Sequence, residues 1–71
     1  MIWFYERKGD HLRCELQLPA EGDRYTLVIT APDGTETVES YTDTDELTQR
    51  TVDLEQRLQL QGWSGPFSRD R

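Results

Sequence analysis

The feature that most constrains this chain is one long stretch with helical periodicity, which runs from Asp43 to Trp63. Apolar or small side chains recur within it at i, i+4, i+7 and i+11, on one stripe of a 3.6-residue period. These positions are Leu47, Thr51, Leu54 and Leu58. The pattern predicts one amphipathic helix, with Leu60 pointing away from the buried stripe.

Both ends of this predicted helix carry suitable capping residues. Asp43 can accept hydrogen bonds from the free N–H groups of the first turn, and Glu46 stands three residues later, as in a capping box. At the other end Gly62 suits a left-handed position just after the helix. A Schellman cap would then place Trp63 against Leu58.

Four β-prone segments precede the helix, each bounded by turn residues. They are residues 2–7, 11–18, 24–30 and 35–41. Short turns between them favour antiparallel pairing of neighbours. The sequence therefore predicts an α+β fold in two layers: a four-stranded antiparallel meander (ββββ) with one C-terminal α-helix packed on one face. We expect one domain over residues 1–64 and a flexible C-terminal tail over 65–71, where glycine, proline and charges follow Trp63.

The register of the first hairpin decides which aromatic side chains face the helix, because a shift by one residue exchanges the two faces of a strand. A three-residue loop ending at Gly9 would place Phe4 opposite Leu12 and turn Trp3 and Tyr5 outward. A two-residue loop of Gly9 and Asp10 would turn them inward. The first is favoured, because a glycine closing a type I turn is common.

On the favoured register the sheet face opposite the helix forms a partner-binding face. If the last hairpin closes through a three-residue loop, Pro32-Asp33-Gly34, Val38 also lies opposite Val28 on this face. The predicted face consists of Trp3, Tyr5, Arg13, Val28 and Val38. Large exposed apolar side chains usually mark a contact surface, so we expect a protein partner or a homodimer.

Residues with catalytic or ligand-binding chemistry are sparse. The single histidine, His11, has no nucleophile or acid placed to work with it, and Cys14 sits among inward leucines, as a small core residue would. The acidic cluster near Asp43 reads as a helix cap, and phosphate-binding and metal-binding motifs are missing. The sequence therefore predicts no enzyme activity, no cofactor and no metal site.

Composition limits the class of partner and the compartment. The 71 residues carry a net charge of −6, which disfavours phosphate binding and makes nucleic acid an unlikely partner. A lone cysteine, no secretory leader pattern and no apolar run of about 20 residues predict a cytoplasmic protein without membrane contact. The expected function is a small non-enzymatic interaction module, protein-binding or self-associating through the uncovered sheet face.

The alternative function is single-stranded nucleic-acid binding by aromatic residues on the sheet. Four antiparallel strands followed by a helix resembles, at the level of fold, the single-stranded-DNA-binding coactivator and Whirly domains. That resemblance implies a sheet on which bases stack. Trp3 and Tyr5 are the aromatics that this reading requires on the open face.

Overall fold

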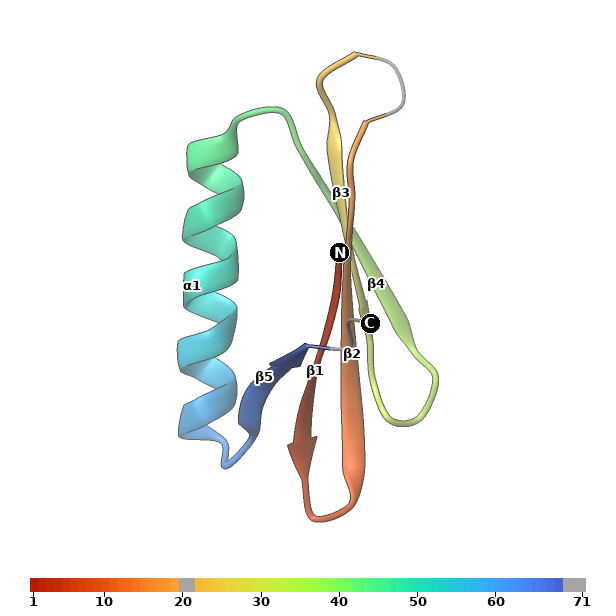
Figure 1. Ribbon diagram of the computed structural model, residues 1–71, viewed down its shortest axis with the longest axis vertical. Coiled ribbons are helices and arrows are strands. Elements are labelled where there is room, and N and C mark those ends of the chain that lie inside the picture. The colour runs from red at the N-terminus through yellow and green to blue at the C-terminus, as the bar shows by residue number, and fades with distance from the viewer. Residues whose placement is uncertain (20–21, 69–71) are drawn as a thin grey trace.

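The computed structural model describes residues 1–19 and 22–68, which form one curved antiparallel sheet with one helix beside it (Figure 1). In chain order the elements are β1 (Ile2–Arg7), β2 (Asp10–Gln17), β3 (Tyr25–Thr30), β4 (Glu36–Tyr41), α1 (Thr44–Leu60) and β5 (Ser64–Ser68). The strand order is β4-β3-β2-β1-β5. The predicted α+β class and the meander of the first four strands are confirmed, and a fifth strand extends the sheet.

The fifth strand corrects the prediction of a flexible tail from residue 65. β5 leaves the helix and pairs antiparallel with β1, placing Phe67 opposite Phe4 and Ser64 opposite Glu6. The close approach depends on Gly65: a Cβ there would lie 2.9 Å from both the Phe4 carbonyl oxygen and Tyr5 Cδ1. In the sequence, glycine and proline at this point suggest the end of regular structure. In the fold, they belong to a strand that pairs closely and irregularly with β1. Residues 69–71 of the predicted tail lie outside the described part of the chain.

The first hairpin corrects both registers considered from the sequence. Its loop is Lys8-Gly9, so Tyr5 lies opposite Leu12 and Trp3 opposite Cys14. Both loop residues have positive φ, 52° at Lys8 and 86° at Gly9, as a type I′ turn requires. The aromatics therefore face the helix, as they would have with the less favoured loop. A positive φ at lysine costs backbone energy, which burial of Tyr5 to 2% exposure offsets.

The last hairpin follows the three-residue loop that the sequence predicted. The Gly34 N–H donates to the Ala31 carbonyl (2.9 Å), and the Ala31 N–H donates to the Thr35 carbonyl (2.8 Å). The Thr35 N–H also donates to Asp33 Oδ1 at 2.9 Å, which lowers the pKa of the Asp33 carboxyl. Val28 consequently lies opposite Val38, as expected.

The helix begins and ends as its capping residues predicted. Asp43 Oδ1 accepts from the Asp45 N–H at 2.9 Å. At the other end the Trp63 N–H donates to the Leu58 carbonyl and the Gly62 N–H to the Gln59 carbonyl, the two bonds of a Schellman cap. Leu60 is 88% exposed, so the predicted helix phase is correct.

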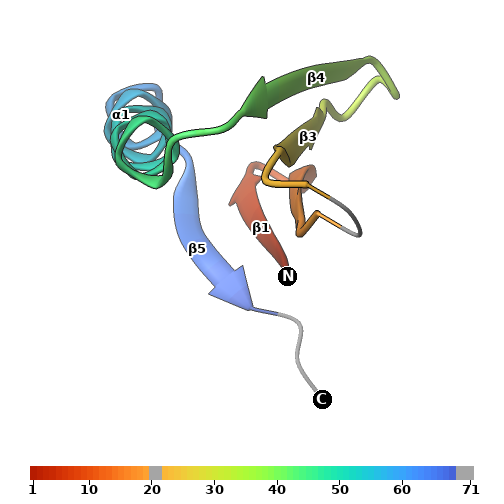
Figure 2. The ribbon, with the colours of Figure 1, turned by 90° about the horizontal axis from the view of Figure 1, so that it is seen from above.

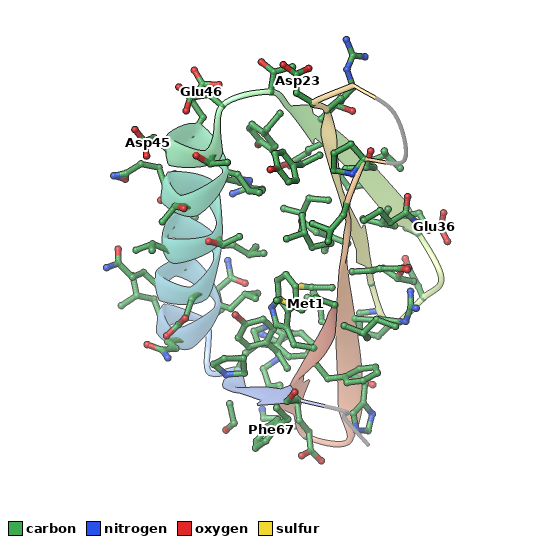
Figure 3. All side chains as sticks on the ribbon, turned by 45° about the horizontal axis from the view of Figure 1, so that its top comes forward. Met1, Asp23, Glu36, Asp45, Glu46 and Phe67 are labelled. Carbon is green, nitrogen blue, oxygen red and sulfur yellow. The ribbon has the colours of Figure 1, made fainter. Side chains whose placement is uncertain are left out.

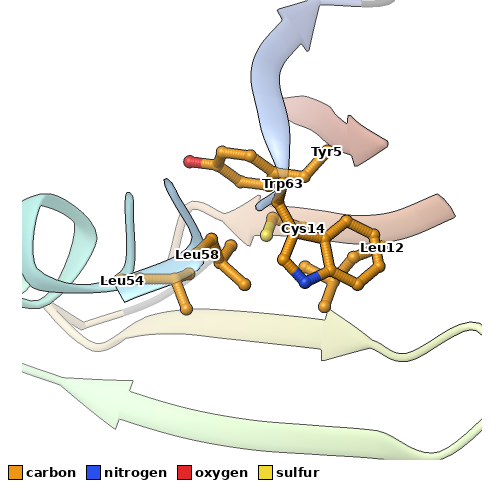
Figure 4. Packing of buried hydrophobic residues seen from close by; sticks show 6 residues of the cluster. All are labelled: Tyr5, Leu12, Cys14, Leu54, Leu58 and Trp63. Atoms are coloured by element: carbon orange, nitrogen blue, oxygen red, sulfur yellow. The ribbon is translucent and has the colours of Figure 1, made fainter. Parts of the chain in front are cut away.

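The main core lies between the C-terminal half of α1 and the centre of the sheet. Leu54 and Leu58 project from the helix, and Trp63 packs beside them (Figure 4). The sheet contributes Tyr5, Leu12 and Cys14, with Trp3 and Ile29 packed at the margin. Arg7 extends from β1 over the Trp63 ring at 4.6 Å and donates to the Gln61 carbonyl at 3.0 Å. This cation therefore stands at the negative end of the helix dipole.

A polar clamp joins the N-terminal half of α1 to the sheet. Arg50 pairs with both oxygens of Glu39 on β4, at 2.8 and 3.0 Å. The Tyr41 hydroxyl donates to Glu39 Oε1 at 2.7 Å. Bonding to Arg50 lowers the pKa of Glu39, and bonding to Glu39 raises the pKa of Tyr41. The helix is thus attached to β4 by charge rather than by apolar packing.

Candidate interaction surface

The sheet face turned away from α1, which we call the outer face, carries bulky apolar side chains on four strands. The strand registers place them in two groups on either side of β2. One group is Ile2, Phe4 and Phe67 on β1 and β5; the other is Val28 and Val38 on β3 and β4. Val38 is 60% exposed and Phe67 48%. These fractions are high for residues of this size and make the outer face the leading candidate for contact with another molecule.

Polar side chains of β2 separate the two groups. Arg13 lies opposite Phe4, and Glu15 lies opposite both Ile2 and Val28. Arg13 and Glu15 are two residues apart on one face of the strand and form an ion pair at 3.2 Å. Their charges largely cancel, so the middle of the outer face offers a neutral, hydrogen-bonding strip.

A shallow hollow of about 420 Å³ lies at the β1–β5 end of this face. It is lined by Phe4, Glu6, His11, Phe67 and Ser68. Phe67 projects at that end of the molecule in Figure 3. His11 is exposed beside two phenylalanine rings, and this setting suits contact with a flat apolar group better than acid–base chemistry.

Three of the five residues predicted for the partner-binding face lie on the outer face: Arg13, Val28 and Val38. Trp3 and Tyr5 do not, because the Lys8-Gly9 turn shifts β1 by one position and directs both rings toward α1. Their place is taken by Ile2, Phe4 and Phe67, which are not among the residues predicted for this face. The sequence does contain one signal for the observed register of β1. Gly9 is the second residue of the two-residue loop Lys8-Gly9, and a type I′ turn usually requires a glycine at that position.

The two edges of the sheet differ in how they are protected. β5 contains Pro66, which has no N–H to donate, and its pairing with β1 is interrupted between Phe4 and Glu6. β4 pairs with β3 over six consecutive positions and contains neither proline nor lysine. Figure 2 shows β4 at the end of the sheet, with no other described element against its free side. Glu36 and Glu39 place charge on β4, but its even ladder and lack of proline leave its backbone groups more open to strand pairing than those of β5.

A second concave site lies between the N-terminal half of α1 and β1. This groove has a volume of about 420 Å³. Its apolar lining consists of Met1, Trp3, Leu16, Leu47, Val52 and Pro66, and Ile2 borders it at the start of β1. Glu55 and the buried Tyr5 supply polar groups, and burial raises the pKa of the Tyr5 hydroxyl. The groove and the polar clamp both lie at the N-terminal half of the helix.

Cys14 is a free cysteine, and it is buried. Burial raises the pKa of the Cys14 thiol to about 11, so at neutral pH the thiolate that would react is scarce. Over residues 1–19 and 22–68, no three histidine, cysteine or acidic side chains gather as a metal site would require. The same residues contain no helix with the length and apolar character needed to cross a bilayer.

Comparison with known proteins returns no family model, no curated protein and no solved structure that matches this chain.

Proposed function

We propose that this protein is a small non-enzymatic interaction module that binds protein, in the first place a second copy of itself, through the uncovered side of its sheet. The observation that carries the proposal is the outer face, where Val38 and Phe67 are 60% and 48% exposed on a sheet that the helix covers from one side alone. A chain of 71 residues buries only about 60% of its unfolded surface. Association would add the burial that so short a chain lacks.

The outer face favours protein over nucleic acid. Trp3 and Tyr5, the aromatics that base stacking was to use, face the helix. Arg13 is the one cation at the centre of the face, and Glu15 pairs with it. Single-stranded nucleic acid needs a positive groove as well as stacking rings. Phe4 and Phe67 supply rings, but the charge around them does not attract phosphate.

The test is the mass of the protein in solution as a function of concentration. Sedimentation equilibrium between about 10 and 500 μM covers the range of weak, transient interfaces. We expect a monomer–dimer equilibrium that weakens when Val28 and Val38 are both replaced by threonine, which keeps strand propensity and removes apolar area. Leu60→Ser is the matched control, because Leu60 is exposed on the helix, away from the sheet.

A monomer at every concentration, with no protein partner captured, would overturn the proposal. Titration of a fluorescent single-stranded oligonucleotide at low salt separates the alternative. Binding that weakens as salt is added would support a nucleic-acid-binding domain in its place.

A further inference from the structure

The phase of the last hairpin determines which backbone groups of β4 point away from the sheet. The Ala31 N–H donates to the Thr35 carbonyl, so this pair is hydrogen-bonded. Bonded and non-bonded pairs alternate along an antiparallel ladder. Thr37, Glu39 and Tyr41 therefore turn their N–H and C=O groups toward β3, and Glu36, Val38 and Ser40 turn theirs outward. Three donors and three acceptors line the free edge.

Building on the function proposed above, we infer that this edge is the seam of a two-fold dimer, in which β4 pairs antiparallel with β4 of a second copy about an axis at Val38. In that register Val38 lies opposite Val38 of the second copy, and Glu36 lies opposite Ser40. Every outward backbone group of both strands then forms a hydrogen bond. Two five-stranded sheets become one continuous sheet of ten strands.

Charge, strand length and valine alignment together favour this register, because an axis at Ser40 would also avoid like charges but would place Val38 opposite Thr42, outside β4. An axis at Glu39 would place two Glu39 carboxylates opposite each other, and an axis at Glu36 would do the same for Glu36, with like-charge repulsion across the strands. An axis at Thr37 would place Ser40 opposite the turn residue Gly34 and lose its backbone bonds. With the axis at Val38, each Glu39 lies opposite Thr37 of the second copy. Arg50 already neutralises that carboxylate on the inner side.

The outer face supplies the apolar contribution. Val28 lies directly opposite Val38 within one copy, so the seam aligns four valines in a row across the dimer. Cross-strand pairs of β-branched side chains stabilise antiparallel sheets. The row joins the Val28–Val38 groups of the two copies into one patch. At this register β4 meets its own copy with no like charges directly opposite, with every outward backbone group bonded and with the valines aligned, and this self-match points to a second copy of this chain as the occupant.

The opposite edge offers no comparable seam. Pro66 lacks an N–H, and the irregular β1–β5 pairing twists β5 out of an even ladder. Each copy carries a net charge of −6, so two copies repel and the dimer should tighten as salt screens that repulsion. This salt dependence is opposite in sign to that of nucleic-acid binding.

Cysteine cross-linking tests the register directly. Val38→Cys places two sulfurs on a hydrogen-bonded pair whose Cα atoms would lie about 5.5 Å apart, within disulfide range. Ser40→Cys is the matched control: it shares the strand, face and outward phase, but the two Ser40 positions would lie four residues out of step. We expect a disulfide-linked dimer from Val38→Cys under mild oxidation and none from Ser40→Cys. The native Cys14 is buried and serves as an unreactive background.

A second variant tests the backbone pairing without the side chain. Val38→Pro removes an N–H that points outward and leaves the β3–β4 ladder intact. We expect the dissociation constant to rise at least tenfold, with an unchanged circular dichroism spectrum. If this variant is unfolded, the cross-linking result decides alone. Phe67→Ser, at the far end of the outer face, should leave the dimer intact.

The outcomes separate this inference from the function on which it rests. A dimer that Phe67→Ser dissociates, with no cross-link at Val38→Cys, would place the contact face to face, overturning the β4 seam and leaving self-association standing. A cross-link at Ser40→Cys in place of Val38→Cys would also overturn the register. A monomer up to about 500 μM in about 0.5 M salt would remove both proposals.

Discussion

The two halves of the helix are held to the sheet by different physics. At the C-terminal half Leu54, Leu58 and Trp63 close over Tyr5 and Cys14 in a continuous apolar cluster. At the N-terminal half two buried leucines, Leu27 and Leu47, are accompanied by the clamp of Arg50, Glu39 and Tyr41, with the groove beside them. The residues named at the C-terminal half are buried, whereas Glu39 and Arg50 at the N-terminal half keep 22% and 28% of their side-chain exposure.

The contrast between the two halves of the helix indicates where the stability of this two-layer domain is concentrated. Apolar burial is insensitive to pH and grows with the area removed from water. An ion pair that retains 22% and 28% of its side-chain exposure contributes less and depends on protonation and salt. The C-terminal half should therefore determine whether the chain folds. The N-terminal half should determine how closely the helix approaches β4, and hence how wide the groove is.

The largest effect is expected from truncating a buried side chain in the C-terminal half of the helix. Leu58→Ala removes a side chain that is 6% exposed and should lower the free energy of unfolding by about 2–5 kcal/mol. Leu60→Ala, two residues further and 88% exposed, should change it by less than about 0.5 kcal/mol. Urea denaturation followed by circular dichroism measures both. Equal losses at the two positions would show that Leu60 is buried in an interface or that the C-terminal half of the helix contributes no more stability than an exposed site.

An intermediate effect is expected from the clamp, and it should depend on pH. Arg50 holds the pKa of Glu39 below its ordinary value of 4.5 in the folded state. A depressed carboxyl pKa contributes stability that is fully present above the unfolded value and is lost as pH falls through the folded one. Glu39→Gln should therefore cost about 1–2 kcal/mol at pH 7, and the gap from the native protein should close as the pH falls below about 4.5.

The measurement is the difference in unfolding free energy between the native protein and Glu39→Gln at each pH. Taking the difference cancels the other acids, including Asp33, whose pKa is also lowered. Asp53→Asn is a useful control, because Asp53 contacts Arg50 only at 3.4 Å and makes its shorter ion pair, 2.9 Å, with the exposed Arg57 on the same helix. A gap that stays constant down to pH about 3 would show that the clamp does not depend on the Glu39 charge.

The helix half of the fold could be predicted from sequence because its signals are local. Asp43, Gly62 and Trp63 each act within one turn of their own position, and the leucine period fixes the buried face without reference to the sheet. The Pro32-Asp33-Gly34 loop was predictable for the same reason. It gave the Val28–Val38 pair, which became the centre of the proposed seam.

The remainder depends on contacts between distant segments. Lys8 accepts a positive φ because Tyr5 and Trp3 gain burial against a helix that begins more than thirty residues later, and turn preferences carry no trace of that gain. In the sequence alone, Gly65 and Pro66 suggest a loose chain end, because the need for glycine at position 65 comes from the close approach of β1. Both differences from the prediction change the outer face. The observed register of β1 takes Trp3 and Tyr5 off this face, and the pairing of β5 with β1 places Phe67 on it.

The smallest effect is expected at the C-terminal end of the helix, where Arg7 links β1 to Gln61 and Trp63. Its guanidinium lies 4.6 Å from the Trp63 ring centroid and bonds the Gln61 carbonyl at 3.0 Å. Arg7→Met keeps an unbranched apolar stem and removes both interactions, so it should cost about 0.5–1 kcal/mol. Arg7→Lys keeps the charge near the helix dipole but loses the planar stack on Trp63. Its free energy of unfolding should therefore lie between those of the native protein and Arg7→Met.

Denaturation at low and high salt distinguishes the contributions of Arg7. Attraction of a cation to the exposed helix end is screened by salt, whereas stacking of the side chain on Trp63 is far less so. The Lys8→Met variant is the matched control, because Lys8 carries the same charge one residue along and points from the exposed turn. A loss at Arg7→Met that equals the loss at Lys8→Met would show that Arg7 acts through general charge. In that case the stabilising contacts at the C-terminal end of the helix would end at Trp63 and would not include Arg7.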